Sequence, residues 1–166
     1  KFTEKLIKDS GIAFTILRPS FYMDSYIVEI EIAMEKGVYR STVGESGVAF
    51  ISRHDIARCA ATILLDESHI GKTYNLTGPG AVTGHDFAEI AAKFSGREVV
   101  YQKIFLNTLI EDYIERGMPQ MIAEMSAGLE TIIATKELGK VSNDVELITG
   151  KPGTDFETFM RQAIGK

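Results

Sequence analysis

The order of apolar and polar positions along the chain predicts helices and strands that alternate over its first two thirds. Apolar side chains at helical spacing predict helices over 2–9, 21–36, 56–65 and 87–94. Short apolar runs predict strands over 12–17, 38–43, 48–51, 73–76 and 99–104. Beyond residue 105 the pattern is mainly helical, over 107–134 with an interruption at 117–119, then over 141–150 and 154–164. Alternation of this kind is typical of the α/β class.

Several helix boundaries carry residues that stabilise helix ends. Ser52 with Asp55, and Thr83 with Asp86, each place a hydroxyl and a carboxylate three positions apart, immediately before an apolar helical run. These pairs predict N-caps, so Asp55 is interpreted as a helix-terminal residue rather than a catalytic acid. Gly96 is predicted to end the helix that Thr83 begins.

The run at 12–17 is short, β-branched and almost wholly apolar. Such a run predicts a strand that is buried on both faces in a parallel sheet. Arg18-Pro19 is expected to end the strand, because proline cannot donate to the ladder of hydrogen bonds. With the helix at 2–9 and the turn at Ser10-Gly11, this strand forms half of a β-α-β unit.

Composition limits the classes of function. The 166 residues suffice for a single domain with a core, and 45% of them are hydrophobic. A net charge of −5, without a basic run, gives no support for binding to nucleic acid or to an anionic membrane. No apolar stretch is long enough to span a bilayer. The single cysteine, Cys59, is predicted to be a buried, inert thiol, and the expected compartment is the cytoplasm.

Residues with potential for chemistry are few. The three histidines have no metal-ligand spacing, so no metal site is predicted. Gly78-Pro79-Gly80 is interpreted as a turn, because the proline removes an amide donor that a phosphate cradle needs. Met118, Met121 and Met125 lie at helical spacing, which fits either core packing or the wall of an apolar pocket.

Three segments, in order, resemble the NmrA-like atypical short-chain dehydrogenase/reductases, and most closely their NAD(P)H:quinone oxidoreductase type 2-like members. They cover roughly residues 1–105. The segments are Thr3-Glu4 to Ile16-Leu17-Arg18-Pro19-Ser20-Phe21-Tyr22, then Phe50-Ile51-Ser52-Arg53-His54-Asp55-Ile56-Ala57, then Gly71-Lys72-Thr73-Tyr74-Asn75-Leu76-Thr77-Gly78-Pro79.

The resemblance implies a Rossmann-like NAD(P)-binding fold, of which this chain has the last parallel strands and the helical substrate-binding region. In such proteins the loop after the sixth strand closes over the nicotinamide, which implies cofactor contacts for Arg18, Pro19, Ser20, Phe21 and Tyr22. Phe21 and Tyr22 are equally compatible with core packing at a turn between strand and helix. The later helices of the family form a substrate lid, which implies a substrate pocket at Met118, Met121 and Met125.

The family's Gly-rich phosphate-binding turn does not occur in this sequence. The whole of 1–166 is therefore expected to be one domain, the C-terminal portion of a longer protein whose dinucleotide-binding half lies outside it. Where the family uses Tyr-x-x-x-Lys, the register places the lysine near residue 1 or just before it, which makes Lys1 a candidate, and places its tyrosine before the chain. We expect NADP or NAD to bind the intact protein and not to bind this chain tightly.

The function that follows is NAD(P)-dependent reduction of a quinone or a small carbonyl compound, with this chain as the substrate-side half and inactive alone. Two alternatives stay open: a non-catalytic dinucleotide-sensing regulator that acts through a protein partner, and a nucleotide-sugar epimerase-like enzyme. A small-molecule substrate is the expected ligand. An exposed sheet edge is expected to allow self-association.

Overall fold

The computed structural model describes residues 2–42, 44–133 and 137–165. Its strands are β1 (Ile16–Pro19), β2 (Val38–Ser41), β3 (Thr73–Leu76) and β4 (Val100–Lys103). Its α-helices are α1 (Phe2–Asp9), α2 (Ile27–Lys36), α3 (Arg53–Leu64), α4 (Gly84–Ser95), α5 (Leu106–Glu115), α6 (Gln120–Ile133), α7 (Asp144–Thr149) and α8 (Phe156–Ala163). Short 3₁₀ helices are η1 (Met23–Tyr26), η2 (Glu67–His69) and η3 (Glu137–Gly139). The predicted α/β class is confirmed.

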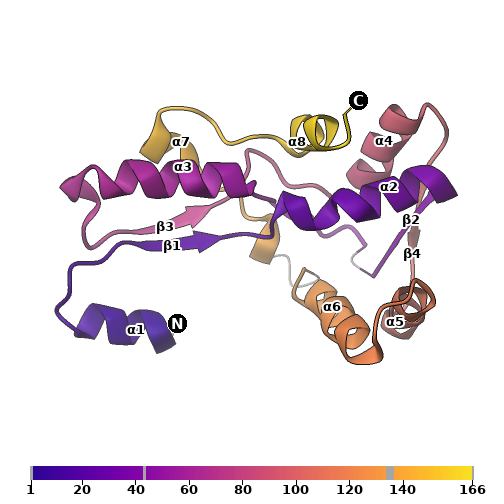
Figure 1. Ribbon diagram of the computed structural model, residues 1–166, viewed down its shortest axis with the longest axis horizontal. Coiled ribbons are helices and arrows are strands. Elements are labelled where there is room, and N and C mark those ends of the chain that lie inside the picture. The colour runs from indigo at the N-terminus through magenta and orange to yellow at the C-terminus, as the bar shows by residue number, and fades with distance from the viewer. Residues whose placement is uncertain (1, 43, 134–136, 166) are drawn as a thin grey trace.

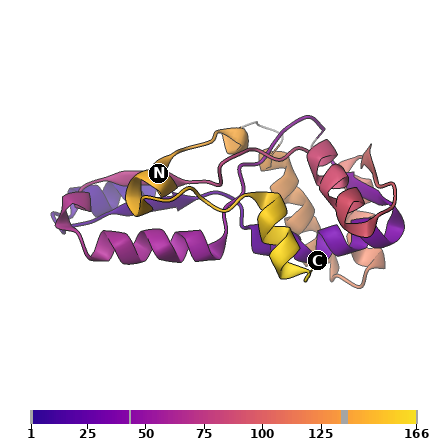
Figure 2. The same ribbon diagram turned by 90° about the horizontal axis from the view of Figure 1, so that it is seen from above.

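The strands form two separate parallel pairs. β1 pairs with β3, so that Ile16 lies opposite Thr73 and Pro19 opposite Leu76. β2 pairs with β4 in the same parallel sense. The molecule is elongated: α1, β1, β3, α3 and α7 lie toward one end, and α2, α4, α5, β2 and β4 toward the other (Figures 1 and 2). We call these the strand-end region and the packed region.

The packed region holds the larger core. Phe87 of α4 stacks on Tyr39 of β2, with ring centroids 4.0 Å apart, and lies near Phe156 of α8. Ile30 and Met160 are completely buried in the same cluster. Apolar side chains from α2, α4, α8 and β2 therefore meet around one aromatic centre, which accounts for the compact packing of this region.

The caps predicted from the sequence are confirmed. Ser52 accepts the N–H of Asp55 at the start of α3. Thr83 and Asp86 form a reciprocal capping box at the start of α4, and Gly96 ends that helix with φ at 67°. These bonds occupy backbone N–H groups that a helix end otherwise leaves without partners.

The prediction of a strand over 12–17 buried on both faces is wrong. β1 begins at Ile16, Ile12 is 72% exposed, and no residue of β1 is buried. Within the described residues β1 has a neighbouring strand on one edge only, and α1, below β1 in Figure 1, buries none of its side chains. An apolar run makes a strand suitable for burial, but burial needs neighbours on both sides. The helix predicted from residue 21 also begins later, as η1 at Met23 followed by α2.

Candidate functional site

A cleft of about 880 Å³ opens where β1 and β3 end. Arg18, Pro19 and Ser20 line it from β1, and Asn75 with residues 77–79 line it from β3. Both strands run in the same direction, so their carboxyl ends meet at this edge. In open α/β sheets ligands bind in the crevice outside the carboxyl ends of the strands. The cleft is therefore the candidate site.

The facing wall of the cleft comes from residues 137–146, which follow α6. The hydroxyl of Thr77, just past β3, accepts the N–H of Ser142 at 2.9 Å. The carboxylate of Asp144 accepts the N–H of Asn75 at 2.7 Å. These two hydrogen bonds attach residues 142–144 to the edge of β3 that faces away from β1. The backbone of β3 is therefore partly paired on that edge. Over residues 2–42, 44–133 and 137–165, the free edge of the pair belongs to β1.

A third side of the cleft, Pro152 and Gly153, is attached to the start of α3. Asp55 is 1% exposed, and its carboxylate accepts the Thr154 N–H at 2.8 Å and the Ser52 hydroxyl at 2.9 Å. Arg58 joins the Asp55 carboxylate at 2.8 Å and donates to the Pro152 carbonyl. Burial opposes the charge, but these hydrogen bonds together hold the pKa of Asp55 below its ordinary value. Asp55 is confirmed as a helix-terminal residue, and it also positions the cleft wall.

Two polar side chains, Ser20 and Arg18, stand at the end of β1 among the residues that line the cleft. The Ser20 hydroxyl oxygen is buried and has no hydrogen-bond partner within the described residues. A buried hydroxyl without a partner costs free energy, which a ligand atom or a water can recover. The Arg18 guanidinium is held by the Glu4 carboxylate of α1 through Nε at 2.8 Å and Nη2 at 2.5 Å. This contact lowers the pKa of Glu4 and raises that of Arg18, so both stay charged.

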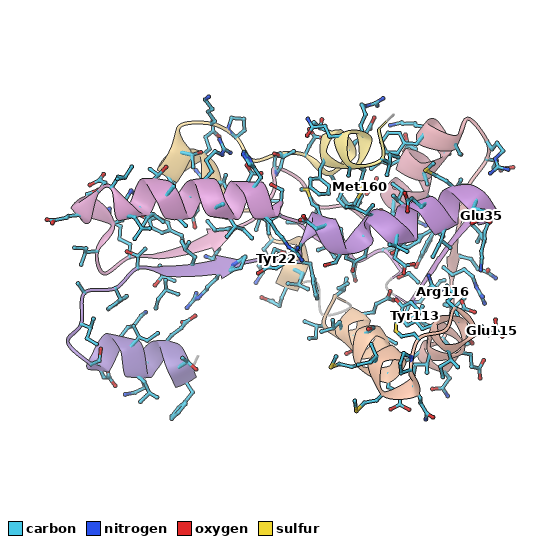
Figure 3. The ribbon with its side chains drawn as sticks, viewed as in Figure 1. Tyr22, Glu35, Tyr113, Glu115, Arg116 and Met160 are labelled. Atoms are coloured by element: carbon cyan, nitrogen blue, oxygen red, sulfur yellow. The ribbon has the colours of Figure 1, made fainter. Side chains whose placement is uncertain are left out.

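The predicted cofactor loop divides between the cleft and the core. Arg18, Pro19 and Ser20 line the cleft. Phe21 packs against the large core cluster, and Tyr22 packs with the cluster around Ile51. Figure 3 shows Tyr22 just beyond the arrowhead of β1. Neither aromatic ring lines the cleft, so core packing is the alternative that the structure favours for both.

The other predicted site residues lie away from the cleft. Met121 and Met125 are 74% and 63% exposed on α6, so the core alternative is wrong for these two. Met118 packs against the small cluster that α5 and α6 form between themselves. None of the three lines the cleft, and their role toward substrate stays a prediction. Lys1 lies outside the described residues.

Gly78-Pro79-Gly80, interpreted as a turn, forms a bend at Pro79 and Gly80. The Gly78 N–H donates to the Phe50 carbonyl at 2.6 Å, so it is not free for a phosphate. A Cβ at position 78 would lie 2.4 Å from the same carbonyl oxygen, which explains why the position requires glycine. The cleft also has no excess of positive charge, since Arg18 and Lys140 are matched by Glu137 and Glu146 in its lining.

A second buried polar centre, at Glu130 of α6, was not predicted from the sequence. Glu130 is 7% exposed and accepts the Thr42 N–H at 2.7 Å, the Thr42 hydroxyl at 2.8 Å and the Ser41 hydroxyl at 3.0 Å. Burial raises its pKa, and the hydrogen bonds offset only part of that effect. Burial likewise raises the pKa of Tyr113 on α5, which Figure 3 shows close to Arg116. A single glutamate in an amphipathic helix gives no sign of such burial.

Other predictions concern absences and reactivity. Cys59 is fully buried, and burial raises the pKa of its thiol, which disfavours the reactive thiolate. Over residues 2–42, 44–133 and 137–165, the His, Cys, Asp and Glu side chains form no group of three or more that could hold a metal ion. No helix in the described part of the chain is long and apolar enough to cross a membrane.

The fold and the cleft define the class: an α/β protein with a cleft at the carboxyl ends of two parallel strands. Similar sequences indicate which α/β proteins this chain resembles. Quinone oxidoreductase 2 of Escherichia coli is 32% identical over 152 residues, which are 92% of this chain and 53% of the relative. The NAD(P)H azoreductase of Xenophilus azovorans is 29% identical over 95% of this chain and 55% of the relative. Prestalk A differentiation protein A of Dictyostelium discoideum is 29% identical over 96% and 53%.

Solved structures of similar fold include reductases of the same kind. The E. coli quinone oxidoreductase complexed with NADPH superposes with a TM-score of 0.90, at 30% identity, over 98% of this chain and 57% of that one. The Citrobacter triphenylmethane reductase complexed with NADP(H) gives 0.90 at 30% identity, over 97% and 56%. A nucleoside-diphosphate-sugar epimerase from Staphylococcus aureus gives 0.86 at 26% identity, over 96% and 56%.

No protein-family model matches the chain. The sequence and structural relatives nevertheless indicate its class: over part of their length, the chain is similar to the quinone oxidoreductase 2 group of the NmrA-like atypical short-chain dehydrogenases/reductases. It spans about half the length of the relatives that it matches.

Proposed function

We propose that residues 1–166 form the C-terminal, substrate-side part of an NAD(P)H-dependent reductase that acts on a quinone or another small carbonyl compound. The observation that carries the proposal is the cleft at the carboxyl ends of β1 and β3. The names of the relatives support it, since they describe reductases of quinones, an azo compound and triphenylmethane dyes, two of them seen with NADPH or NADP(H).

The charges and polar groups of the cleft fit the nicotinamide end of the cofactor better than its phosphates. The acidic and basic residues of the lining balance, and the Gly78 amide is already used within the fold. A phosphate needs an excess of positive charge or free amides. A nicotinamide with its ribose needs hydrogen bonds to neutral oxygen and nitrogen atoms, and the unpartnered Ser20 hydroxyl fits that need.

In this proposal the bound cofactor supplies the hydride, and the chain supplies orientation. Ser20 and the backbone at Pro19 hold the nicotinamide end in the cleft. The wall at 137–146, fastened by Thr77 and Asp144, excludes water from one side of the site. The exposed apolar face of α6 with Met121 and Met125 provides the substrate wall. Lys1 in the Tyr-x-x-x-Lys role stays a prediction, as does the cytoplasmic compartment.

The first experiment determines the mass of the native polypeptide in its source cells and compares its NADPH binding with that of residues 1–166. We expect a native mass well above 18.3 kDa, NADPH binding by the native protein, and no micromolar binding by residues 1–166. Micromolar binding of NADPH by residues 1–166 alone would contradict the proposal that most of the cofactor site lies outside these residues.

A site variant makes the same experiment specific to the cleft. Ser20→Val replaces the hydroxyl by a methyl group and is expected to weaken NADPH binding about tenfold, because a buried donor is lost. Ser68→Ala in the exposed turn η2 serves as the matched control. Equal affinities of the Ser20→Val variant and the unaltered protein would contradict the assignment of the cleft.

Two other functions have a relative in their favour. The name of the Dictyostelium relative describes a differentiation protein and no enzyme activity, which is compatible with a regulator that binds dinucleotide without turnover and acts through a protein partner. The S. aureus structure favours a nucleotide-sugar epimerase. Binding of NADPH without oxidation by any quinone would support the regulator, and conversion of a nucleotide sugar without net consumption of NADPH would support the epimerase.

We also propose that residues 1–166 in isolation associate through the free edge of β1. Backbone groups on an unpaired strand edge readily bind another strand. Light scattering of the isolated chain measures this directly, and a monodisperse monomer would contradict it.

A further inference from the structure

We infer that Glu4 of α1 sets the charge selectivity of the cleft by neutralising Arg18, so that the site accepts an uncharged oxygen-bearing group of the ligand and disfavours an anionic one. The inference rests on the proposed function, because it concerns the nicotinamide end of the cofactor in the same cleft. Glu4 is a positioning residue here: it acts through Arg18 and does not line the cleft itself.

The geometry of the ion pair leaves one edge of the guanidinium open. Glu4 occupies Nε and Nη2 of Arg18, one with each carboxylate oxygen. Arg18 Nη1 has no hydrogen bond within the described residues, while Arg18 lines the cleft. An arginine bound on one side by a carboxylate keeps its plane fixed, and its remaining N–H groups keep a defined direction. Nη1 is therefore the donor that α1 presents to a ligand.

The charge of the pair decides what Nη1 can bind. Glu4 and Arg18 together carry no net charge, and their side chains are only 23% and 44% exposed. A hydroxyl or carboxamide oxygen can accept from Nη1 without approaching another charge closely. A phosphate would gain little from the neutral pair and would be repelled by the Glu4 carboxylate. Because both groups are partly exposed to water, the selectivity is modest rather than absolute.

A matched carboxylate on the same helix provides the control. Asp9 forms an ion pair with Lys5 at 2.5 Å, and neither residue lines the cleft. Glu4→Gln and Asp9→Asn change the net charge of the protein equally and each removes one ion pair of α1. A general effect of charge or of helix stability would appear in both variants, whereas an effect through Arg18 would appear only in the first.

The test uses the native polypeptide that carries this chain and two probes that displace NADPH, followed by fluorescence. Reduced nicotinamide riboside is uncharged, and reduced nicotinamide mononucleotide adds one phosphate. In Glu4→Gln the ratio of the two affinities is expected to shift about threefold toward the mononucleotide, because the charge of Arg18 is no longer offset. In Asp9→Asn the ratio is expected to stay unchanged.

A double substitution decides whether Glu4 acts through Arg18. In an Arg18→Gln background, Glu4→Gln is expected to leave the ratio unchanged. An unchanged ratio in Glu4→Gln alone, an equal shift in Asp9→Asn, or a shift that persists in the Arg18→Gln background would overturn the inference while leaving the cleft assignment intact. If neither probe displaces NADPH from the unaltered protein, the proposed nicotinamide site is wrong and the inference falls with it.

Discussion

The packed region and the strand-end region each contain one parallel pair of strands with helices beside it, but they differ in how far their side chains are buried. In the packed region Phe87 is 2% exposed, and α2, α4 and α8 close around it. In the strand-end region Phe2 of α1 is 77% exposed, and one edge of β1 has no partner strand in the described part of the chain. The difference indicates that the packed region provides its own stability, whereas the strand-end region offers surface to a ligand or to further chain. The cleft opens at the carboxyl ends of β1 and β3, in the strand-end region.

The largest expected effect tests whether the core is confined to the packed region. Phe87→Ala should lower the free energy of unfolding by about 3 to 5 kcal/mol, because it leaves a cavity among Tyr39, Tyr26 and Phe156. Phe2→Ala should change it by less than about 0.5 kcal/mol. Urea denaturation measures both, and a comparable loss in the two variants would mean that α1 is buried in the native protein.

The next effect concerns the hydrogen bonds that attach the segment at Pro152 and Thr154 to Asp55 and Arg58 of α3. Asp55→Ala leaves the Thr154 N–H and Arg58 without their carboxylate and should cost about 2 to 3 kcal/mol. The folded-state pKa of Asp55 is lowered, so its contribution is present above its ordinary value of 3.8 and is lost as the pH falls through the folded value. Unfolding curves at pH 7 and pH 3 should therefore differ less in the variant. A variant as stable as the unaltered protein at pH 7 would show that these hydrogen bonds are dispensable.

Glu130 tests how α6 is held to the end of β2 in the packed region. Glu130→Ala should cost about 1 to 3 kcal/mol, because the Ser41 hydroxyl and the Thr42 N–H lose their acceptor.

The pH dependence of Glu130 has the opposite sign to that of Asp55. Its folded-state pKa lies above the ordinary value of 4.5, so its contribution is full below that value and is lost as the pH rises through the folded value. Relative to Glu130→Gln, which cannot titrate, the unaltered protein should lose stability between pH 4.5 and pH 7. A difference between the two that is constant with pH would show that Glu130 titrates normally.

The smallest effect compares one helix cap from each region. Thr83→Ala removes the capping box of α4 and should lower the free energy of unfolding by about 1 kcal/mol. Asp66→Ala removes the cap of the exposed turn η2 near the far end of β3 and should cost less, because that turn supports no core. Thermal melts of both variants make the comparison. The reverse order would mean that the strand-end region limits the stability of the whole chain.

Local signals fixed much of this structure in advance. Ser52, Thr83 and Gly96 mark their helix ends because a cap depends only on residues within one turn, and periodicity located most helices and strands for the same reason. The motif that ends β1 at Pro19 also indicated Arg18 and Ser20, and all three residues line the cleft.

Only the tertiary structure decided which side chains are buried and which distant residues contact one another. Glu130 is buried because Ser41 and Thr42, nearly 90 positions earlier, supply its hydrogen bonds, whereas Met121 and Met125 on the same helix are exposed. The cleft needs β1, β3 and the wall at 137–146 together, and Glu4 reaches Arg18 only because α1 folds back beneath β1. Sequence alone sets preferences within a few residues, but burial and charge pairing depend on neighbours that are distant in the chain.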